Sequence, residues 1–177
     1  TSKITFPGSG IAAMATSPNN LEDITKQLKM QTIGHDKVNQ LRHVRYFGDI
    51  HGLMVHMKKH ADILRPKFEM VEWILDEELG DLGIGEWTKP TGGYFIYFKS
   101  LEGCAKAIVK RCKKCGVKMT PAGATWPYGK DPYDRDIRIA PSYPPVEDLR
   151  IATKLFALSV RIVSAEKILA GMQEANA

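Results

Sequence analysis

The residues with the clearest chemical potential lie at the start of the chain, where Lys3 stands between hydroxyl residues and an apolar stretch. The segment Thr1-Ser2-Lys3 runs into Ile4-Thr5-Phe6 and then into the glycine-rich turn Pro7-Gly8-Ser9-Gly10. Apolar surroundings favour the neutral amine over the ammonium ion, and a neutral lysine amine attacks carbonyl carbons to form a Schiff base. Lys3 is therefore a candidate nucleophile. An ordinary solvated lysine is the alternative that these residues leave open.

The three cysteines offer a second kind of chemistry, which the sequence does not support. Cys104, Cys112 and Cys115 form an odd, closely spaced set, whereas a secreted disulfide framework has an even and dispersed one. Cys112 and Cys115 have the spacing of a metal-binding or redox pair, but a structural zinc ion needs four ligands and no second pair is suitably placed. We therefore expect reduced helix thiols and no metal site.

Two histidines have the spacing of metal ligands on a helix. His56 and His60 lie four residues apart, but Met57 occupies the position at which zinc hydrolases carry a glutamate. Neighbouring lysines would also repel a cation. Solvated histidines are the favoured interpretation.

Length, composition and charge set the outer limits. The chain has 177 residues, of which 44% are hydrophobic, as expected for one large or two small globular domains. It contains no apolar run long enough to span a bilayer and no secretory signal, so we expect a cytoplasmic protein without a membrane partner. The net charge is +5, but the basic segment around Lys106, Lys110 and Lys114 lacks the aromatic residues of a single-strand binder. We therefore expect a solvated helix face there and no nucleic-acid partner.

Periodicity predicts alternating helices and strands, and hence an α/β fold with helices packed on a small sheet. Helices are expected from Ser17-Pro18 onward, over 36–47, over 49–79 with a kink or break at Pro66, over 104–115 and over 147–169. Strands are expected over 11–15, 94–98, 117–120 and 137–140. The long helix is expected to contain a domain boundary, near residues 50 to 60.

The order of four motifs resembles that of the pyridoxal-phosphate-dependent aminotransferases of fold type I. They are Ser2-Lys3 with Pro7-Gly8, the segment Pro90 to Phe95, the segment Gly116-Val117 leading to Pro121-Ala122-Gly123, and Ile137-Arg138-Ile139-Ala140 before a long helix. The resemblance spans nearly the whole chain, and it is strongest to the bacterial aspartate aminotransferase-like or alanine-glyoxylate aminotransferase-like branch.

The resemblance implies that the chain is the C-terminal portion of a longer protein. Residues 1–55 would end the large domain that binds the cofactor, and residues 56–177 would form the small α/β domain, with a long helix joining the two. The upstream segment would carry further cofactor-binding residues. The complete protein would be a homodimer.

Site residues follow from the same resemblance. Lys3 would form the Schiff base with pyridoxal 5′-phosphate and later shuttle a proton. Arg138 would bind the substrate α-carboxylate through two parallel hydrogen bonds. Its alternative is a strand-end arginine paired with Asp136 or Asp134.

One position departs from the family pattern. The family commonly places a phosphate-binding arginine shortly after the Pro-Gly turn, where this chain has Gly10 or Ile11. Backbone amides of Gly8, Ser9 and Gly10, with the hydroxyls of Ser2, Thr5 or Ser9, are therefore expected to bind the cofactor phosphate. A purely conformational role for this turn stays open.

The expected activity is transfer of an amino group from an amino acid, with aspartate as the expected donor, to a 2-oxo acid. The alternatives are a noncatalytic regulatory or interaction module with the same fold, and a lyase or decarboxylase that uses the same cofactor.

Overall fold

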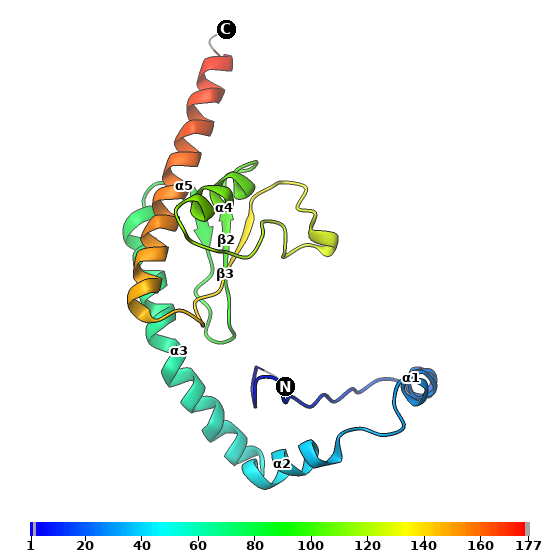
Figure 1. The fold of residues 1–177 in the computed structure, drawn as a ribbon. Helices are drawn as coiled ribbons and strands as arrows, with labels where there is room; N and C mark the ends of the chain where they lie inside the picture. Colours follow the sequence, from blue (N-terminus) through cyan, green and yellow to red (C-terminus); the bar gives the residue numbers. More distant parts are fainter. Residues whose placement is uncertain (2, 176–177) are drawn as a thin grey trace. The chain divides into compact units, whose positions relative to one another are not determined.

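The computed structural model describes residues 1 and 3–175, which fall into two compact units, Thr1–Asp62 and Ile63–Ala177. We call them the N-terminal unit and the C-terminal unit. The elements in chain order are α1 (Pro18–Gln31), α2 (Lys37–Phe47), α3 (Ile50–Leu79), β1 (Gly85–Trp87), β2 (Ile96–Ser100), α4 (Ala105–Lys114), a 3-10 turn (Pro127–Gly129), β3 (Asp136–Ile139) and α5 (Val146–Ala175) (Figure 1). The prediction of a mixed helix and strand structure is confirmed.

The ends of α1 and α2 follow from local capping chemistry. The Ser17 side chain accepts a hydrogen bond from the amide of Asn20, and Pro18 occupies the first turn of α1. Asp36 caps α2 in the same way, because its Oδ1 accepts from the amide of Asn39 at 2.9 Å. Gly48 ends α2 with a φ of +70°. Both predicted helix starts and the predicted end at Gly48 are confirmed.

The C-terminal unit contains a three-stranded antiparallel sheet in the order β1-β2-β3. The register places Phe98 opposite Ile137 and Tyr97 opposite Arg138. Because side chains alternate along a strand, the members of each pair point to the same face of the sheet. One face thus carries apolar residues, and the other carries Tyr97 and Arg138.

The apolar face of the sheet forms the core with α4, α5 and the part of α3 that lies in this unit. Ile96 and Phe98 are fully buried, and the ring of Phe98 meets that of Phe156 edge to face at 5.0 Å. The backbone of Gly85 lies so close to the Phe98 ring that a Cβ at position 85 would be 2.5 Å from it. Phe98 therefore requires glycine at position 85.

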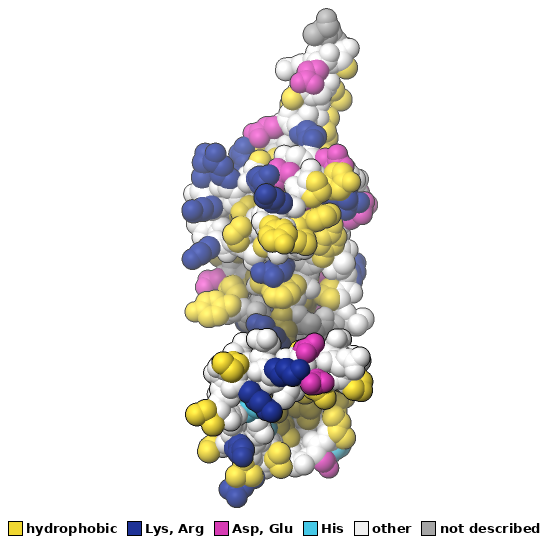
Figure 2. All heavy atoms as spheres, turned by 90° about the vertical axis from the view of Figure 1, so that its right-hand side faces the viewer, with side chains coloured by type: hydrophobic (Ala, Val, Ile, Leu, Met, Phe, Trp, Pro, Cys, Tyr) yellow, Lys and Arg dark blue, Asp and Glu magenta, His cyan; other side chains and the backbone are white. Residues whose placement is uncertain are grey.

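The N-terminal unit has no comparable core. Among its described residues only Thr5 and His43 are buried. Many of its apolar side chains are exposed instead, and hydrophobic atoms are visible at the surface in Figure 2. They include Met30, Ile33, Val38, Val44, Ile50 and Met54.

Two predicted strands are wrong. Residues 11–15 form no strand and are mostly exposed, because this unit supplies no neighbouring strand among the described residues. Ile11 instead bonds to Thr1, which donates to its carbonyl and accepts from its amide at 2.8 Å. Residues 117–120 are not a strand, because Val117 closes α4: its amide donates to Cys112 O at 2.9 Å, and the Gly116 amide donates to Lys113 O at 3.1 Å. These two hydrogen bonds, together with the φ of +86° at Gly116, form a Schellman motif.

Pro66 does not split the long helix, as the sequence analysis allowed, because α3 continues past Pro66 from Ile50 to Leu79.

Strand β1 was not predicted, because three residues are too short for a periodic signal. Among residues 1 and 3–175, no helix is both long and apolar enough to cross a membrane.

The distribution of buried side chains predicts that residues 63–177 fold on their own. All the buried apolar residues that the structure describes, from Met70 to Val163, lie in this unit. We expect this polypeptide to unfold cooperatively in urea, as followed by circular dichroism. Residues 1–62 alone should show no cooperative transition, because they bury no apolar side chain fully. A cooperative transition of residues 1–62 would contradict this expectation.

Candidate functional site

The candidate nucleophile Lys3 lies in a tight turn at the start of the N-terminal unit. The carbonyl of Thr1 accepts hydrogen bonds from the amides of Ile4 at 2.8 Å and Thr5 at 2.9 Å. Lys3 is exposed on this turn. Ser2, another predicted cofactor-binding residue, lies outside the described residues.

Thr5 fastens the turn to α2 and α3. Its buried hydroxyl lies 3.0 Å from His43 Nε2, and its carbonyl lies 3.1 Å from His56 Nε2. Because a carbonyl oxygen can only accept a hydrogen bond, His56 Nε2 carries a hydrogen. His43 Nδ1 lies 2.8 Å from Asn39 O and carries a hydrogen for the same reason. His56 is therefore half-buried and bonded, which corrects the interpretation of it as a solvated residue.

The glycine-rich turn borders an open hollow. Gly8 has a φ of +77°, and among the described residues no atom lies within 4 Å of where its Cβ would be. The hollow has a volume of about 420 Å³ and is lined by Gly8, Ser9, Gly10, Asp36, Val38, Asn39 and Arg42. Residues of α2 thus face the turn that the sequence predicts to bind phosphate.

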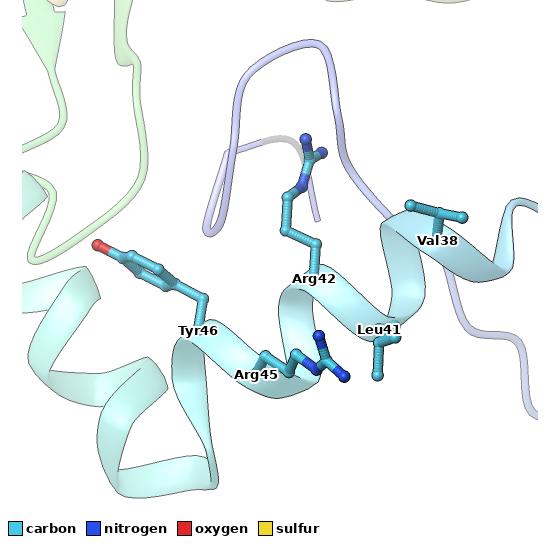
Figure 3. Close-up of a pocket in the computed structure, with 5 residues that line it drawn as sticks. All are labelled: Val38, Leu41, Arg42, Arg45 and Tyr46. Carbon is cyan, nitrogen blue, oxygen red and sulfur yellow. The ribbon is translucent and has the colours of Figure 1, made fainter.

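Four residues that line this hollow were not predicted as site residues, namely Asp36, Val38, Asn39 and Arg42. The Asn39 side-chain amide donates to Ser9 O at 2.9 Å, and Arg42 donates to Asn39 Oδ1. Figure 3 shows Arg42 reaching from α2 toward the N-terminal segment, beside a second hollow of about 430 Å³ lined by Val38, Leu41, Arg42, Arg45 and Tyr46. The helical spacing of Asp36, Asn39 and His43 places these three on one face and could have indicated Asn39, whereas no comparable signal marks Arg42.

Arg138 lies on the face of the sheet opposite to the apolar core. Its guanidinium carbon is 4.5 Å from the centroid of the Phe95 ring. Its Nε is buried and has no hydrogen-bond partner among the described residues. The same holds for Arg135 Nε, Trp87 Nε1 and Ser164 Oγ, so this feature alone does not distinguish Arg138.

The alternative interpretation of Arg138, an ion pair with Asp136 or Asp134, does not hold among the described residues. Asp136 accepts from the Tyr97 hydroxyl at 2.6 Å and from the Trp126 indole, and it lies 3.8 Å from Arg135. The Asp134 carboxylate lies 3.9 Å from Lys106 Nζ and also accepts a hydrogen bond from the backbone amide of Lys106. Both carboxylates are engaged elsewhere, and Arg138 stays without an acidic partner in the part of the chain that the structure describes.

The bonds of Asp136 fix the side chains next to Arg138. Partial burial of the Tyr97 side chain, together with its hydrogen bond to Asp136 and the nearby carboxylate charge, raises the pKa of Tyr97 to about 12. The phenol is therefore a neutral donor at neutral pH. Trp126, which the sequence places in the loop between strands, is anchored to Asp136 in the same way.

Asp131 organises the turn that leads into β3. Its carboxylate accepts from the amides of Tyr133 at 2.9 Å, Arg135 at 2.7 Å and Asp136 at 2.8 Å. Burial alone would raise the pKa of Asp131, but these backbone hydrogen bonds outweigh it, and the net shift is downward. The ionised side chain thus holds the backbone that presents β3.

The cysteines and histidines form no cluster of three or more metal-ligating groups within the described residues. All three cysteines are free thiols: Cys104 and Cys112 are buried and Cys115 is exposed. Burial raises the pKa of the Cys104 and Cys112 thiols, which makes them less reactive.

The sequence as a whole matches a known family. A model described as aspartate amino-transferase matches residues 1–173. The chain belongs to the aspartate aminotransferase family. The resemblance drawn from the motifs is thereby confirmed.

Individual relatives support the assignment of this chain to the aspartate aminotransferase family. The aspartate aminotransferase of Corynebacterium glutamicum is 43% identical over 166 residues, which are 94% of this chain and 38% of the relative. A crystal structure of an aspartate transaminase from the same organism matches with a TM-score of 0.89 and 42% identity, over 94% of this chain and 39% of that one. The chain thus spans about two fifths of the length of these relatives.

A more distant structure shows the fold alone. The alpha-aminoadipate aminotransferase of Thermus thermophilus, solved with N-(5′-phosphopyridoxyl)-L-leucine, has a TM-score of 0.72 at 18% identity. It matches 93% of this chain and 41% of its own length.

The network around Asp136 predicts an unusual tyrosine titration. Tyr97 should ionise near pH 12, because burial and the bond to Asp136 both favour the neutral phenol. The pKa should fall in Asp136→Asn but stay above about 10, the ordinary value for tyrosine, because burial remains. The measurement is the difference in phenolate absorbance between each protein and its Tyr97→Phe counterpart. An unchanged pKa in Asp136→Asn would contradict the assigned bond.

Proposed function

We propose that this chain is the C-terminal portion of an aminotransferase that uses pyridoxal 5′-phosphate to move an amino group from an amino acid to a 2-oxo acid. Family membership and the named relatives support the reaction class. Aspartate is the proposed donor, as the name of the Corynebacterium glutamicum relative suggests. The activity belongs to the complete protein, and residues 1–177 alone should lack it.

The observation that carries the proposal is the state of Arg138. A half-buried guanidinium normally has a carboxylate partner, and this one has only an aromatic ring and no ion pair among the described residues. Its planar array of N–H donors matches a carboxylate in two parallel hydrogen bonds. Arg138 therefore binds the α-carboxylate of the amino acid and orients its Cα for reaction.

Lys3 supplies the primary amine of the site. Pyridoxal phosphate, when bound, provides an aldehyde that takes up amino groups and a ring that withdraws electrons from the substrate Cα. Lys3 Nζ would hold the cofactor through its aldehyde carbon until the substrate amine takes its place. Once released, the neutral Nζ would accept the proton of the substrate Cα and would then deliver it to the former aldehyde carbon.

The glycine turn fits a phosphate group in shape and only partly in charge. The positive φ and open side of Gly8 allow a ligand to approach the backbone closely. The Ser9 amide already donates to Phe6 O at 3.1 Å, so the proposed donors are the amides of Gly8 and Gly10 and the Ser9 hydroxyl. Ser2 and Thr5 are proposed to contribute their hydroxyls, and for Thr5 this competes with its bond to His43.

Two charged side chains, the N-cap Asp36 and Arg42 of α2, border the same hollow and act in opposite directions. Asp36 repels an anion, and its hydrogen bond from the Asn39 amide does not remove this repulsion. Arg42 attracts an anion, and no other arginine lines the hollow among the described residues. The cation supplies charge that the family usually draws from the position of Gly10 or Ile11.

The domain organisation is proposed on the same basis. Residues 1–55 end the large cofactor-binding domain, residues 56–177 form the small domain, and α3 joins them. An upstream segment supplies the remaining cofactor contacts, and the complete protein is a homodimer. The exposed apolar side chains of the N-terminal unit support this, because they need a covering surface.

Replacing Lys3 should abolish the covalent link to the cofactor. In the complete protein, Lys3→Arg should lower turnover by about 10²- to 10⁴-fold, because arginine neither attacks the aldehyde nor accepts a proton at neutral pH. Treatment with borohydride followed by peptide mass analysis should find the cofactor attached to Lys3 in the parent and in the control Lys29→Arg only. A complete protein that binds no cofactor would instead favour the noncatalytic module.

Replacing Arg138 should weaken substrate binding. Arg138→Gln should raise the KM for the amino donor by roughly 10- to 100-fold, as expected for the loss of charge-assisted hydrogen bonds. The exposed Arg150 on α5 provides the control, and Arg150→Gln should leave KM unchanged. An unchanged KM in Arg138→Gln would remove the carboxylate-binding assignment.

A further inference from the structure

We propose that Phe95 is the positioning residue of Arg138, and that its ring fixes the guanidinium so that the N–H donors stay available to the substrate carboxylate. This rests on the proposed function, because it takes Arg138 as the group that binds the carboxylate. The ring centroid lies 4.5 Å from the guanidinium carbon, well within the range of a cation–π contact.

The geometry of the contact explains why a ring suits this position better than an acid. A cation–π contact uses the face of the ring, whereas the five N–H donors of a guanidinium lie in its own plane. An aspartate or glutamate would also hold the arginine, but it would occupy the same donors that a substrate carboxylate needs. Phe95 orients Arg138 without competing for them.

Arg135, three residues earlier in the chain, shows the contrasting arrangement. Its guanidinium lies over the Tyr133 ring at 4.4 Å, and it also pairs with Glu102 at 3.5 Å and Asp136 at 3.8 Å. These two acids hold Arg135 in the fold. The Nε atoms of both arginines lack a hydrogen-bond partner, so the difference lies in the ion pairs: Arg138 has none among the described residues and keeps only the aromatic contact.

Phe95 is held in place by its neighbours along the strand. Ile96 follows it as the first residue of β2 and is fully buried, which fixes the backbone on the core side. Tyr97 is bonded to Asp136 and lies opposite Arg138 in the sheet. Phe95 itself is 41% exposed, so replacing it removes the contact with Arg138 without opening a cavity in the core.

The test compares variants of Phe95 in the complete protein. Phe95→Leu should raise the KM for the amino donor about two- to thirtyfold, the range expected for loss of a cation–π contact, with a smaller change in kcat. The dissociation constant of succinate, a carboxylate that cannot react, should rise by the same factor in calorimetry. Phe95→Tyr keeps the ring and should restore both values.

A double-variant cycle separates positioning from a general structural effect. Once Arg138 is Gln, adding Phe95→Leu should change KM and succinate binding little further, because Phe95 acts through Arg138. Trp73→Leu, which removes an exposed aromatic ring from α3, is the matched control and should leave both values unchanged.

The outcomes distinguish this inference from the proposed function. If Arg138→Gln weakens substrate binding and Phe95→Leu does not, the positioning role is overturned and the carboxylate assignment stands. Equal additional effects of Phe95→Leu with and without Arg138 would likewise overturn it. If Arg138→Gln has no effect, the proposed function itself loses its main support.

Discussion

The alternation of side chains across β2 and β3 is the constraint on which the C-terminal unit depends. The same two strands place Ile96, Phe98 and Ile137 in the core and Tyr97 and Arg138 on the other face. A slip of one residue in the register would bury the arginine and expose the phenylalanine. Packing of Phe98 against Phe156, and its close approach to Gly85, therefore secure the position of a side chain that never touches them.

The treatment of charge on the open face follows a consistent pattern. Asp131 and Asp136 are buried, and each is satisfied by several donors, which offsets the cost of removing a carboxylate from water. Arg135 has two acidic neighbours. Arg138 is the exception, since only an aromatic ring compensates it among the described residues. Such an exception is consistent with a group whose partner is a ligand.

Most helices of this chain could be predicted from the sequence, because their signals are local. Ser17 and Asp36 act as caps within three residues, and Gly48 ends α2 through its own conformation. The strand over 11–15 failed because a doubly buried strand needs neighbours that these residues do not supply. The proposal that Arg138 binds substrate came from the order of motifs, whereas its contact with Phe95 depends on rotamers and could not be predicted. Arg42 and Asn39 were missed for a related reason, since their proximity to Gly8 depends on how α2 packs on the turn.

The absence of a fully buried apolar residue between positions 1 and 62, apart from the undescribed position 2, has a consequence for biosynthesis. Residues 63–177 can complete their core soon after the ribosome releases Val163, since every buried partner is then present. The preceding segment emerges earlier yet cannot finish folding by itself. In the proposed complete protein the upstream segment has already been synthesised at that point, so it can supply the surface on which residues 1–62 fold.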